Sequence, residues 1–258
     1  MRLLAEDEGK AVGIVNRSGQ SDILLVCEHA SRRIPRTLGT LGLDPVALEA
    51  HIAWDPGALA VAERLSAQLD ATLVKQNFSR LVYDCNRPPH SPDAMPVVSE
   101  VYEIAANRAL GDEERQARID EIYRPFQSAL AEVIASRIQA GQGTVLVTIH
   151  SFTPVYKGVQ RAVEIGILHD RDQRMADRML ELAEDDKSYL TRRNEPYGPA
   201  DGVTHTLCEH GLANNLPNVM IEIRNDLIAD EKGQEQAADY VQSLLERSLA
   251  AIRVENRG

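Results

Sequence analysis

Four short apolar runs in the sequence are each followed by side chains that can bind a metal, move a proton or bind an anion. The runs are ILLV, LVY, VLVTI and NVMI, and the groups that follow them are Cys27-Glu28-His29, Asp84-Cys85-Asn86-Arg87, His150-Ser151 and Glu222-Ile223-Arg224-Asn225-Asp226. If the runs are parallel strands, their carboxyl ends lie at one edge of a sheet, where ligands commonly bind. Asp55 joins these groups if the helix that it precedes starts at the same edge.

These residue types suit hydrolysis assisted by a metal. Two histidines and one carboxylate, with a position open for water, form a common ligand set for catalytic zinc, and His29, His150 and Asp55 would supply it. Glu222 is a further carboxylate that can take a proton from water and pass it to a leaving nitrogen. The Asn86-Arg87 pair can bind a substrate carboxylate, because a guanidinium offers two parallel hydrogen bonds to it.

Taken singly, each of these residues also has a structural explanation. A histidine at a strand end is more often a hydrogen-bonded structural group than a ligand. Asp55, which precedes a proline, is typical of a helix N-cap. Glu222 and Arg224 can pair on one face of a strand, and Asn86-Arg87 before two prolines can belong to a turn. The functional interpretation rests on the coincidence of four such groups.

The elements that must position these residues follow from the apolar pattern. We expect strands at residues 22–27, 72–75, 81–84, 144–149, 163–168 and 218–223, and helices at 112–139, 172–184 and 234–253. A further helix is expected to open at Asp55-Pro56-Gly57. This alternation predicts an α/β protein with a largely parallel sheet covered on both faces. We find no linker and no repeat, and expect one domain over residues 1–258, with loops at 86–98 and 195–202 as pocket walls.

Composition excludes several classes of function. The formal net charge of −11 argues against binding to nucleic acid or to an anionic membrane surface. No apolar run is long enough to span a bilayer, and the first residues turn acidic too early for a signal peptide. The 3 cysteines are too few and too scattered for a disulfide framework or a structural zinc site. We therefore expect a cytoplasmic protein, and the sequence does not indicate its oligomeric state.

In the order of these motifs, the chain resembles the N-formylglutamate amidohydrolase family. The resemblance covers residues 23–226 and is visible in CEHAS with the following Ile34-Pro35, in SRLVYDCNR, in IHSFTP and in IEIRNDL. More distantly, the order of these groups is similar to that in zinc carboxypeptidases and aspartoacylase. The resemblance implies a three-layer α/β/α sandwich around a mostly parallel, mixed sheet. It also implies a hydrolase that depends on zinc, or on another divalent metal, and converts a small anionic substrate, N-formyl-L-glutamate, to formate and L-glutamate.

The resemblance further implies a role for each matching residue. These roles are metal ligands for His29, Asp55 and His150, general base for Glu222, oxyanion stabilisation for Arg80, and binding of the substrate carboxylate for Asn86 and Arg87. Apart from the resemblance, Arg224 or Arg161 is available for a second anionic group, and Tyr197, in the loop between His150 and Glu222, is a candidate to grip the substrate. The third metal ligand stays open, because the distant relatives have a carboxylate where this chain has Arg32. Asp55 is favoured since it precedes a helix, as the relatives' carboxylate does. Glu28 is the alternative, although the immediate neighbour of His29 on an extended strand tends to point the other way.

Other hypotheses remain open at this level. The same metal site could act on another N-acyl amino acid or a short peptide, or the strand ends could form a metal-free anion-binding site. A cysteine hydrolase that uses Cys27 or Cys85 is disfavoured, because nothing in the sequence near them predicts a low thiol pKa. The second Cys-Glu-His, in LCEHG at residues 207–211, is expected to be a chance repetition in a helix that ends at Gly211. His205 and Glu209, four residues apart, are a weaker candidate pair near a metal.

Overall fold

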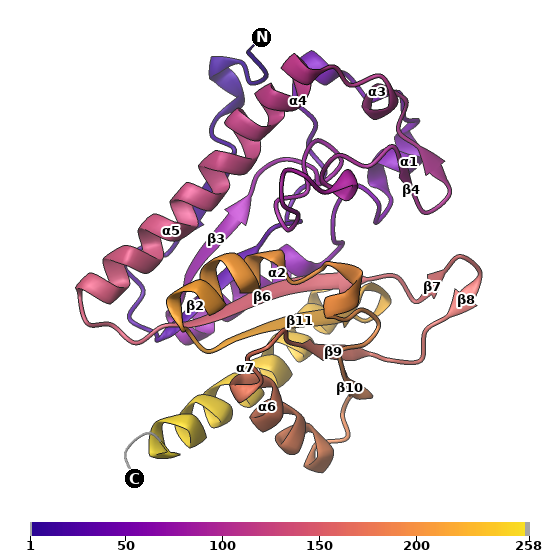
Figure 1. The fold of residues 1–258 in the computed structure, drawn as a ribbon. Coiled ribbons are helices and arrows are strands. Elements are labelled where there is room, and N and C mark those ends of the chain that lie inside the picture. The colour runs from indigo at the N-terminus through magenta and orange to yellow at the C-terminus, as the bar shows by residue number, and fades with distance from the viewer. Residues whose placement is uncertain (1, 256–258) are drawn as a thin grey trace.

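The computed structural model describes residues 2–255, which form an α/β structure built on a seven-stranded sheet (Figure 1). The strands lie in the order β1-β3-β2-β6-β11-β9-β10. Their bounds are Val12–Val15 for β1, Ile23–Cys27 for β2, Thr72–Gln76 for β3, Val145–Phe152 for β6, Ile165–Leu168 for β9, Thr191–Arg193 for β10 and Asn218–Arg224 for β11. The central strands β3, β2, β6 and β11 are parallel, whereas β1 and the β9–β10 pair run the opposite way. The expected mostly parallel, mixed sheet is confirmed.

Helices cover both faces of this sheet, which gives the three expected layers (Figure 1). Helices α2 (Ala58–Leu69), α6 (Arg174–Asp185) and α7 (Glu231–Glu255) pack on one face. The other face is covered by α5 (Arg124–Gln139), which follows α4 (Asp112–Arg118) through the π-helical turn Ile119–Tyr123. Two short helices, α1 (Pro45–Glu49) and α3 (Ala105–Arg108), lie in the long connections. No described helix combines the length and the apolar character that crossing a bilayer would need.

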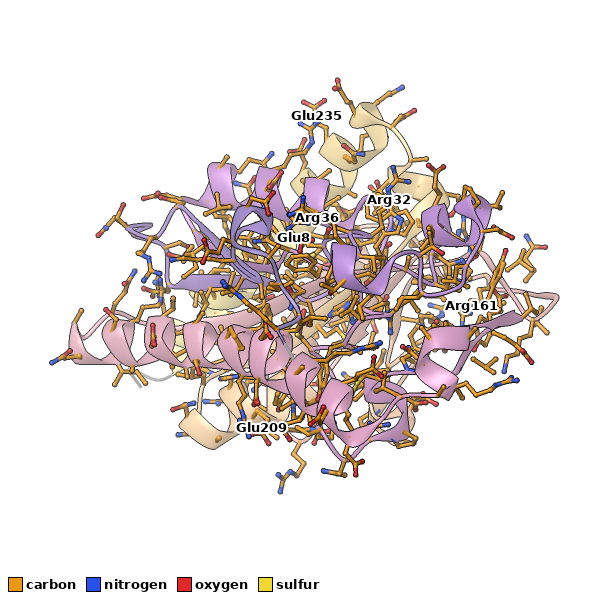
Figure 2. The ribbon with its side chains drawn as sticks, turned by 90° about the horizontal axis from the view of Figure 1, so that it is seen from above. Glu8, Arg32, Arg36, Arg161, Glu209 and Glu235 are labelled. Atoms are coloured by element: carbon orange, nitrogen blue, oxygen red, sulfur yellow. The ribbon has the colours of Figure 1, made fainter. Side chains whose placement is uncertain are left out.

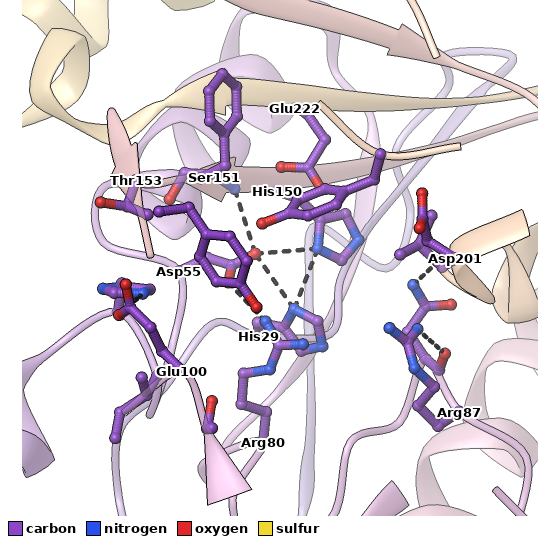
Figure 3. Close-up of a pocket in the computed structure, with 18 residues that line it drawn as sticks. His29, Asp55, Arg80, Arg87, Glu100, His150, Ser151, Thr153, Asp201 and Glu222 are labelled. Carbon is purple, nitrogen blue, oxygen red and sulfur yellow. Dashed lines mark hydrogen bonds and ion pairs between the residues drawn. The ribbon is translucent and has the colours of Figure 1, made fainter. Parts of the chain in front are cut away.

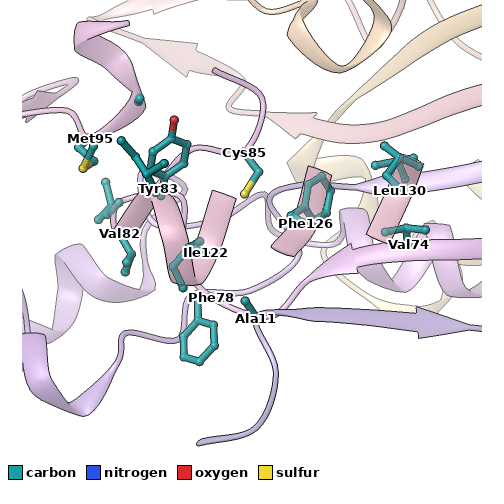
Figure 4. Close-up of a cluster of buried hydrophobic side chains, with 14 of the residues drawn as sticks. Ala11, Val74, Phe78, Val82, Tyr83, Cys85, Met95, Ile122, Phe126 and Leu130 are labelled. Carbon is teal, nitrogen blue, oxygen red and sulfur yellow. The ribbon is translucent and has the colours of Figure 1, made fainter. Parts of the chain in front are cut away.

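The central strands are apolar throughout because both of their faces are buried. Val26 in β2 belongs to the same apolar cluster as Phe126 and Leu130 of α5, the helix side chains that Figure 4 shows beside Val74. Cys27, one residue later, belongs to the cluster formed with α2 and α7 on the opposite face. Such two-sided burial explains why these strands read as continuous apolar runs. It also makes the strand ends fixed positions from which polar side chains can project.

The expected strand at residues 81–84 is wrong, because this segment forms irregular turns. The backbone N–H of Val82 donates to the carbonyl of Ser79 at 3.0 Å, and that of Asp84 donates to the carbonyl of Ala94 at 2.8 Å. These bonds are local or lead to a neighbouring loop, so none is available for a strand ladder. The segment is nevertheless buried beside α4 and α5, and its apolar character reports that burial.

Two hairpins that the sequence did not indicate lie beyond the sheet. They are β4 (Val98–Ser99) with β5 (Tyr102–Glu103), and β7 (Val155–Tyr156) with β8 (Val159–Gln160). Because β9 is antiparallel to β11, it starts at the edge where β6 and β11 end. The chain therefore leaves β6, forms the β7–β8 hairpin and returns to the same edge. A side-chain oxygen of Glu100 accepts a hydrogen bond from the backbone N–H of Lys157 at 3.2 Å, which links the turns of the two hairpins.

Gly57 allows the close turn between Asp55 and α2. Its φ is +80°, and a Cβ at this position would lie 2.6 Å from the carbonyl oxygen of Ile228. We expect Gly57→Ala to lower the free energy of unfolding by about 2–4 kcal/mol, because left-handed strain of an L-residue adds to a contact with backbone. Urea denaturation followed by circular dichroism measures this change.

Gly141→Ala is the matched control for this substitution. Gly141 has a similar φ of +68°, but nothing lies within 4 Å of a Cβ built there. Only the backbone strain remains, so we expect a loss of about 1–2 kcal/mol. Equal losses in both variants would show that the contact with Ile228 does not constrain Gly57.

Candidate metal centre and active site

A cavity of about 330 Å³ opens where β6 and β11 end (Figure 3). Side chains from the sheet edge, from the start of α2, from residues 80–87 and from both hairpins line it. Tyr197, Asp201 and Val203 close a further wall, so both loops expected at the pocket contribute to it. The cavity is large enough for a small metabolite and brings together most of the residues singled out in the sequence.

His29, Asp55 and His150 meet at the base of this cavity and are at most 3% exposed. The two Nδ1 atoms of the histidines lie 3.2 Å apart, and Oδ2 of Asp55 lies 3.2 Å from the first and 3.0 Å from the second. Ligand atoms bound at about 2.0–2.1 Å to a tetrahedral zinc ion are separated by about 3.3 Å. The triangle therefore has the size of one face of a tetrahedral metal site, and it is the one such group found among residues 2–255.

The far sides of both imidazole rings face carboxylates. Nε2 of His29 lies 2.7 Å from Oδ1 of Asp84, and Nε2 of His150 lies 3.2 Å from Oε2 of Glu28. Neutral rings that keep their protons on Nε2 present both Nδ1 lone pairs toward Asp55. Three acceptor atoms that converge in this way fit a cation. Asp55 thus lies at the third-ligand position, while Glu28 lies behind His150.

The charges around the two histidines favour added positive charge. Burial and Arg80 lower the pKa of His29, but Asp84 and Asp55 outweigh them, and the net shift is upward. Burial also lowers the pKa of His150, and Glu28 and Asp55 reverse this and raise it well above its usual range. The carboxylates that raise these pKa values, Asp55, Asp84 and Glu28, also attract a divalent cation to the site.

Asp55 does not serve as the helix N-cap that its sequence context predicted. Helix α2 begins at Ala58, and Gly57 occupies the N-cap position. The Asp55 side chain instead accepts a hydrogen bond from the backbone N–H of Ser151 at 3.2 Å and one from Arg80 at 3.3 Å. Burial raises the pKa of Asp55, but His29, His150 and Arg80 outweigh this effect and lower it, so the carboxylate stays ionised.

Glu222 stands beside His150 on the neighbouring strand. The two residues are paired in the parallel register of β11 and β6, so their side chains project from the same face of the sheet. Glu222 is 5% exposed, and its Oε2 has no hydrogen-bond partner among the described residues. Burial raises the pKa of Glu222 to about 7, with a further contribution from Asp55. A carboxylate with this pKa can both accept and return a proton near neutrality.

Two arginines offer positive charge to a ligand in this cavity. Arg80 is held by Asp55 at 3.3 Å and by Asp84 at 2.8 Å. Arg87 donates from Nη1 to the carbonyls of Asn86 and Gly202 at 2.9 and 2.8 Å, and no described residue accepts from its Nε or Nη2. Those two N–H groups of Arg87 remain available for a carboxylate.

Asn86 is buried and shapes the wall next to Arg87. Its amide nitrogen donates to the carbonyl of Val203 at 2.5 Å, and its amide oxygen accepts from the backbone N–H of Thr206 at 3.0 Å. These two bonds fix the loop that closes the cavity.

Tyr197, in the 195–202 loop, lines the cavity. A Cβ on Gly166 of β9 would clash with the carbonyl of Glu195, so this glycine allows the loop to pass close to the sheet. Gly166 is paired with Glu222 in the register of β9 and β11, which places the loop beside Glu222. The guanidinium of Arg161, labelled in Figure 2, stacks at 4.7 Å from the Tyr197 ring and donates to its hydroxyl at 3.0 Å. Arg161 has no ion pair with a described carboxylate.

The structure does not support Arg224 as a substrate-binding residue. It does not line the cavity, and its guanidinium contacts Asp226 at 2.8 Å and Glu164 at 3.6 Å. It does not pair with Glu222 either. At the end of β11 the side chain is drawn toward these two carboxylates, which the two-residue strand period could not predict.

Neither Cys27 nor Cys85 has the low thiol pKa that a nucleophile would need. Burial raises the pKa of both Cys27 and Cys85 well above the usual range. Cys208 lies in the second Cys-Glu-His, which forms the π-helical turn Leu207–Gly211 at the end of a short helical segment, as expected, and a 3₁₀ turn at Leu212–Asn214 follows it. His205 of the weaker candidate pair contacts the Tyr123 hydroxyl at 2.9 Å and is not part of the metal-type group.

His210, the histidine of the second Cys-Glu-His, makes the stability of the fold depend on pH. It is buried, and Nε2 lies 2.5 Å from Oε1 of Gln127. Burial lowers its pKa to about 4. An unfolded chain binds this proton near pH 6.5, so between about pH 6.5 and 4 the unfolded state holds more protons and stability falls as pH falls.

We expect His210→Gln to weaken this pH dependence. Near pH 5 the histidine contributes a loss of about 2 kcal/mol relative to neutral pH, and the variant lacks it. Urea denaturation of both proteins at pH 7 and pH 5 gives the difference. A wild-type loss no larger than that of the variant would argue against the low pKa.

Several residues of the site were not indicated by the sequence. Asp84 was noticed as a reactive group, but its contact with His29 was not. His51 and Glu100 line the cavity and form an ion pair at 3.2 Å when the histidine is protonated. The position of Asp84 directly after the apolar LVY run was its only signal in the sequence. No sequence pattern indicated His51 or Glu100.

Fold and site together define an α/β protein with a buried centre of two histidines and one carboxylate at the carboxyl edge of a mixed sheet. The model of the N-formylglutamate amidohydrolase family matches residues 21–229 of the sequence. The chain belongs to this family, which places it among the amidohydrolases and indicates a small acyl-amino-acid substrate.

Two solved structures are similar to the chain. The gene product Atu2144 from Agrobacterium tumefaciens has 58% sequence identity and a TM-score of 0.96, with 98% of this chain and 100% of that one covered. N-formylglutamate amidohydrolase from Ralstonia eutropha JMP134 has 20% identity and a TM-score of 0.63, with 97% of each chain covered, and shows the shared fold. A search of curated proteins gave no match.

Proposed function

We propose that this protein is a metal-dependent amidohydrolase that converts N-formyl-L-glutamate and water to formate and L-glutamate. His29, Asp55 and His150 would hold the metal, with zinc as the first candidate, since two imidazoles and one carboxylate form a frequent catalytic zinc set. Another divalent ion with similar ligand preferences would fit as well. The observation that supports this most directly is the triangle of ligand atoms with sides of 3.0–3.2 Å at the base of the cavity.

The metal, when bound, would supply Lewis acidity toward the water and the amide carbonyl. The proton transfers fall to Glu222. Its carboxylate takes a proton from the attacking water while the water oxygen bonds to the formyl carbon, the C–N bond then breaks, and the same proton passes to the leaving nitrogen. A carboxyl group with a pKa of about 7 suits both halves of this exchange.

Arginine side chains would bind the charged parts of the substrate. Arg80 lies beside Asp55 and would stabilise the negative charge that develops on the amide oxygen. Arg87 would bind the α-carboxylate through its free N–H groups, and Asn86 would hold the wall beside it. Tyr197 would cover the bound substrate, with Arg161 behind it.

We also propose that residues 1–258 form one domain, of which the structure describes residues 2–255, and that the protein is cytoplasmic, a location with which three free cysteines are compatible. The alternative substrate is another N-acyl amino acid or a short peptide, for which the same residues would perform the same steps.

A panel of substrates tests the proposed activity. Purified zinc-loaded protein is given formyl and acetyl derivatives of glutamate, aspartate and alanine, and the release of the acid and of the amino acid is measured. The expected result is the highest kcat/KM for N-formyl-L-glutamate. A preference for another derivative would support the alternative substrate, and no hydrolysis of any derivative would overturn the proposed activity.

A further inference from the structure

Glu28 is a buried carboxylate that the proposed mechanism does not use. It follows β2 and has no measurable exposure to solvent, and neither of its oxygens, nor Nε2 of His150, has a hydrogen-bond partner among the described residues. Its closest titratable neighbour is His150, whose Nε2 lies 3.2 Å from Oε2 of Glu28. A carboxylate buried in this way costs several kcal/mol unless a partner compensates it, which calls for an explanation.

The sheet register explains how Glu28 reaches His150. Val26 of β2 is paired with Thr148 of β6, and two residues beyond this pair along each segment Glu28, in the turn after β2, comes within 3.2 Å of His150. His29, next to Glu28, lies instead between Asp55 and Asp84. Glu28 therefore faces the ring of His150 and not that of His29, its neighbour in the sequence.

The ring of His150 lies between two carboxylates. Nδ1 lies 3.0 Å from Oδ2 of Asp55 on the cavity side, and Nε2 faces Glu28 on the protein side. An imidazole can offer a lone pair to a cation from Nδ1 only if its proton is on Nε2. A carboxylate that accepts this proton fixes the tautomer and the orientation of the ring.

We propose that Glu28 is a positioning residue, which keeps the proton of His150 on Nε2 and directs Nδ1 into the metal site. This inference rests on the proposed function in one respect, namely that His29, Asp55 and His150 bind a divalent cation. Asp84 has the corresponding position behind His29, at 2.7 Å. The metal site would then be supported by one carboxylate behind each histidine.

The test measures zinc affinity and does not depend on turnover. The metal-free wild-type protein and the Glu28→Gln variant are titrated with zinc against a chromophoric chelator of known affinity. Loss of the outer carboxylate is expected to raise the zinc Kd about 10–100-fold. The matched control is Glu235→Gln, the same chemical change at an exposed position on α7, labelled in Figure 2. It should leave the Kd unchanged.

A second measurement covers the case that Glu28→Gln does not fold. Nitrogen-15 NMR of the histidine rings in the zinc-loaded wild-type protein reports which ring nitrogen bears the proton. A proton on Nε2 of His150 is expected.

The outcomes separate this inference from the proposed function. A Glu28→Gln variant that binds zinc as tightly as the wild-type protein would overturn the inference, and so would a proton on Nδ1 of His150. A wild-type protein that binds no zinc would overturn both the inference and the metal dependence. Zinc binding with the expected Glu28 effect but without formate release would overturn the proposed activity alone.

Discussion

Replacing Glu222 with glutamine is expected to lower kcat for N-formyl-L-glutamate by about 10²–10⁴-fold, the usual contribution of a positioned general base. The amide keeps the shape of the side chain but cannot accept the proton of the attacking water. Glu222 lies beside the metal-type group and is not part of it, so the zinc content of the variant should equal that of the wild-type protein. Steady-state release of formate and metal analysis of the same samples measure both quantities.

The pH profile gives this prediction a second readout. With a pKa of about 7, the Glu222 carboxyl group is protonated below neutrality, so kcat/KM should fall as pH falls. A cation in the site lowers this pKa, and the acid limb is then expected below pH 7. The limb should be absent from the residual activity of Glu222→Gln, whereas Glu235→Gln should keep it. A Glu222→Gln variant with at least a third of the wild-type kcat would contradict the role of this residue.

Removal of the metal is expected to have a comparably large effect. Dialysis against a chelator should reduce formate release by at least about 10³-fold, because Lewis-acid assistance is worth several kcal/mol in the transition state. Addition of one equivalent of zinc should restore the rate. The measurement is the rate as a function of added zinc, on protein without a histidine tag.

Two controls make this result specific to the proposed site. The same chelator saturated with zinc beforehand should have no effect on the rate. His150→Ala should bind zinc weakly and should not recover after zinc is added, since one of the three ligand atoms is missing. Full activity in protein without detectable metal would rule out the metal-dependent reaction and favour an anion-binding site that works without a cation.

The sequence predicted the central part of the site because its strands have an unambiguous signature. Strands buried on both faces are continuous apolar runs, so the polar residues that end them are conspicuous. His29, His150 and Glu222 were identified in this way, and their meeting at one edge follows from parallel strands. The burial of both sheet faces was predictable from the alternation of strands and helices, and helices α5, α6 and α7 were predictable from their own helical patterns.

Other features depended on contacts that no local pattern contains. The contact between His29 and Asp84 joins residues far apart in the chain, and Asp84 itself lies in a buried turn that has the composition of a strand. The edge strands β1 and β10 were missed because they are short and not fully buried. Arg224 was proposed to bind a second anionic group of the substrate, but nearby carboxylates bind it outside the cavity.

The route of the chain between β6 and β9 bears on how substrate preference can change in this family. The connection between β6 and β9, which contains the β7–β8 hairpin, leaves the sheet and rejoins it at the same edge, beside the site. Its length can therefore change without shifting the strand registers. Insertions, deletions or exchanges in residues 153–162 should therefore reshape one wall of the cavity without moving His150 or Glu222. For protein engineering, this segment is a replaceable module: libraries confined to it would sample new acyl-amino-acid preferences while the hydrolytic centre stays constant.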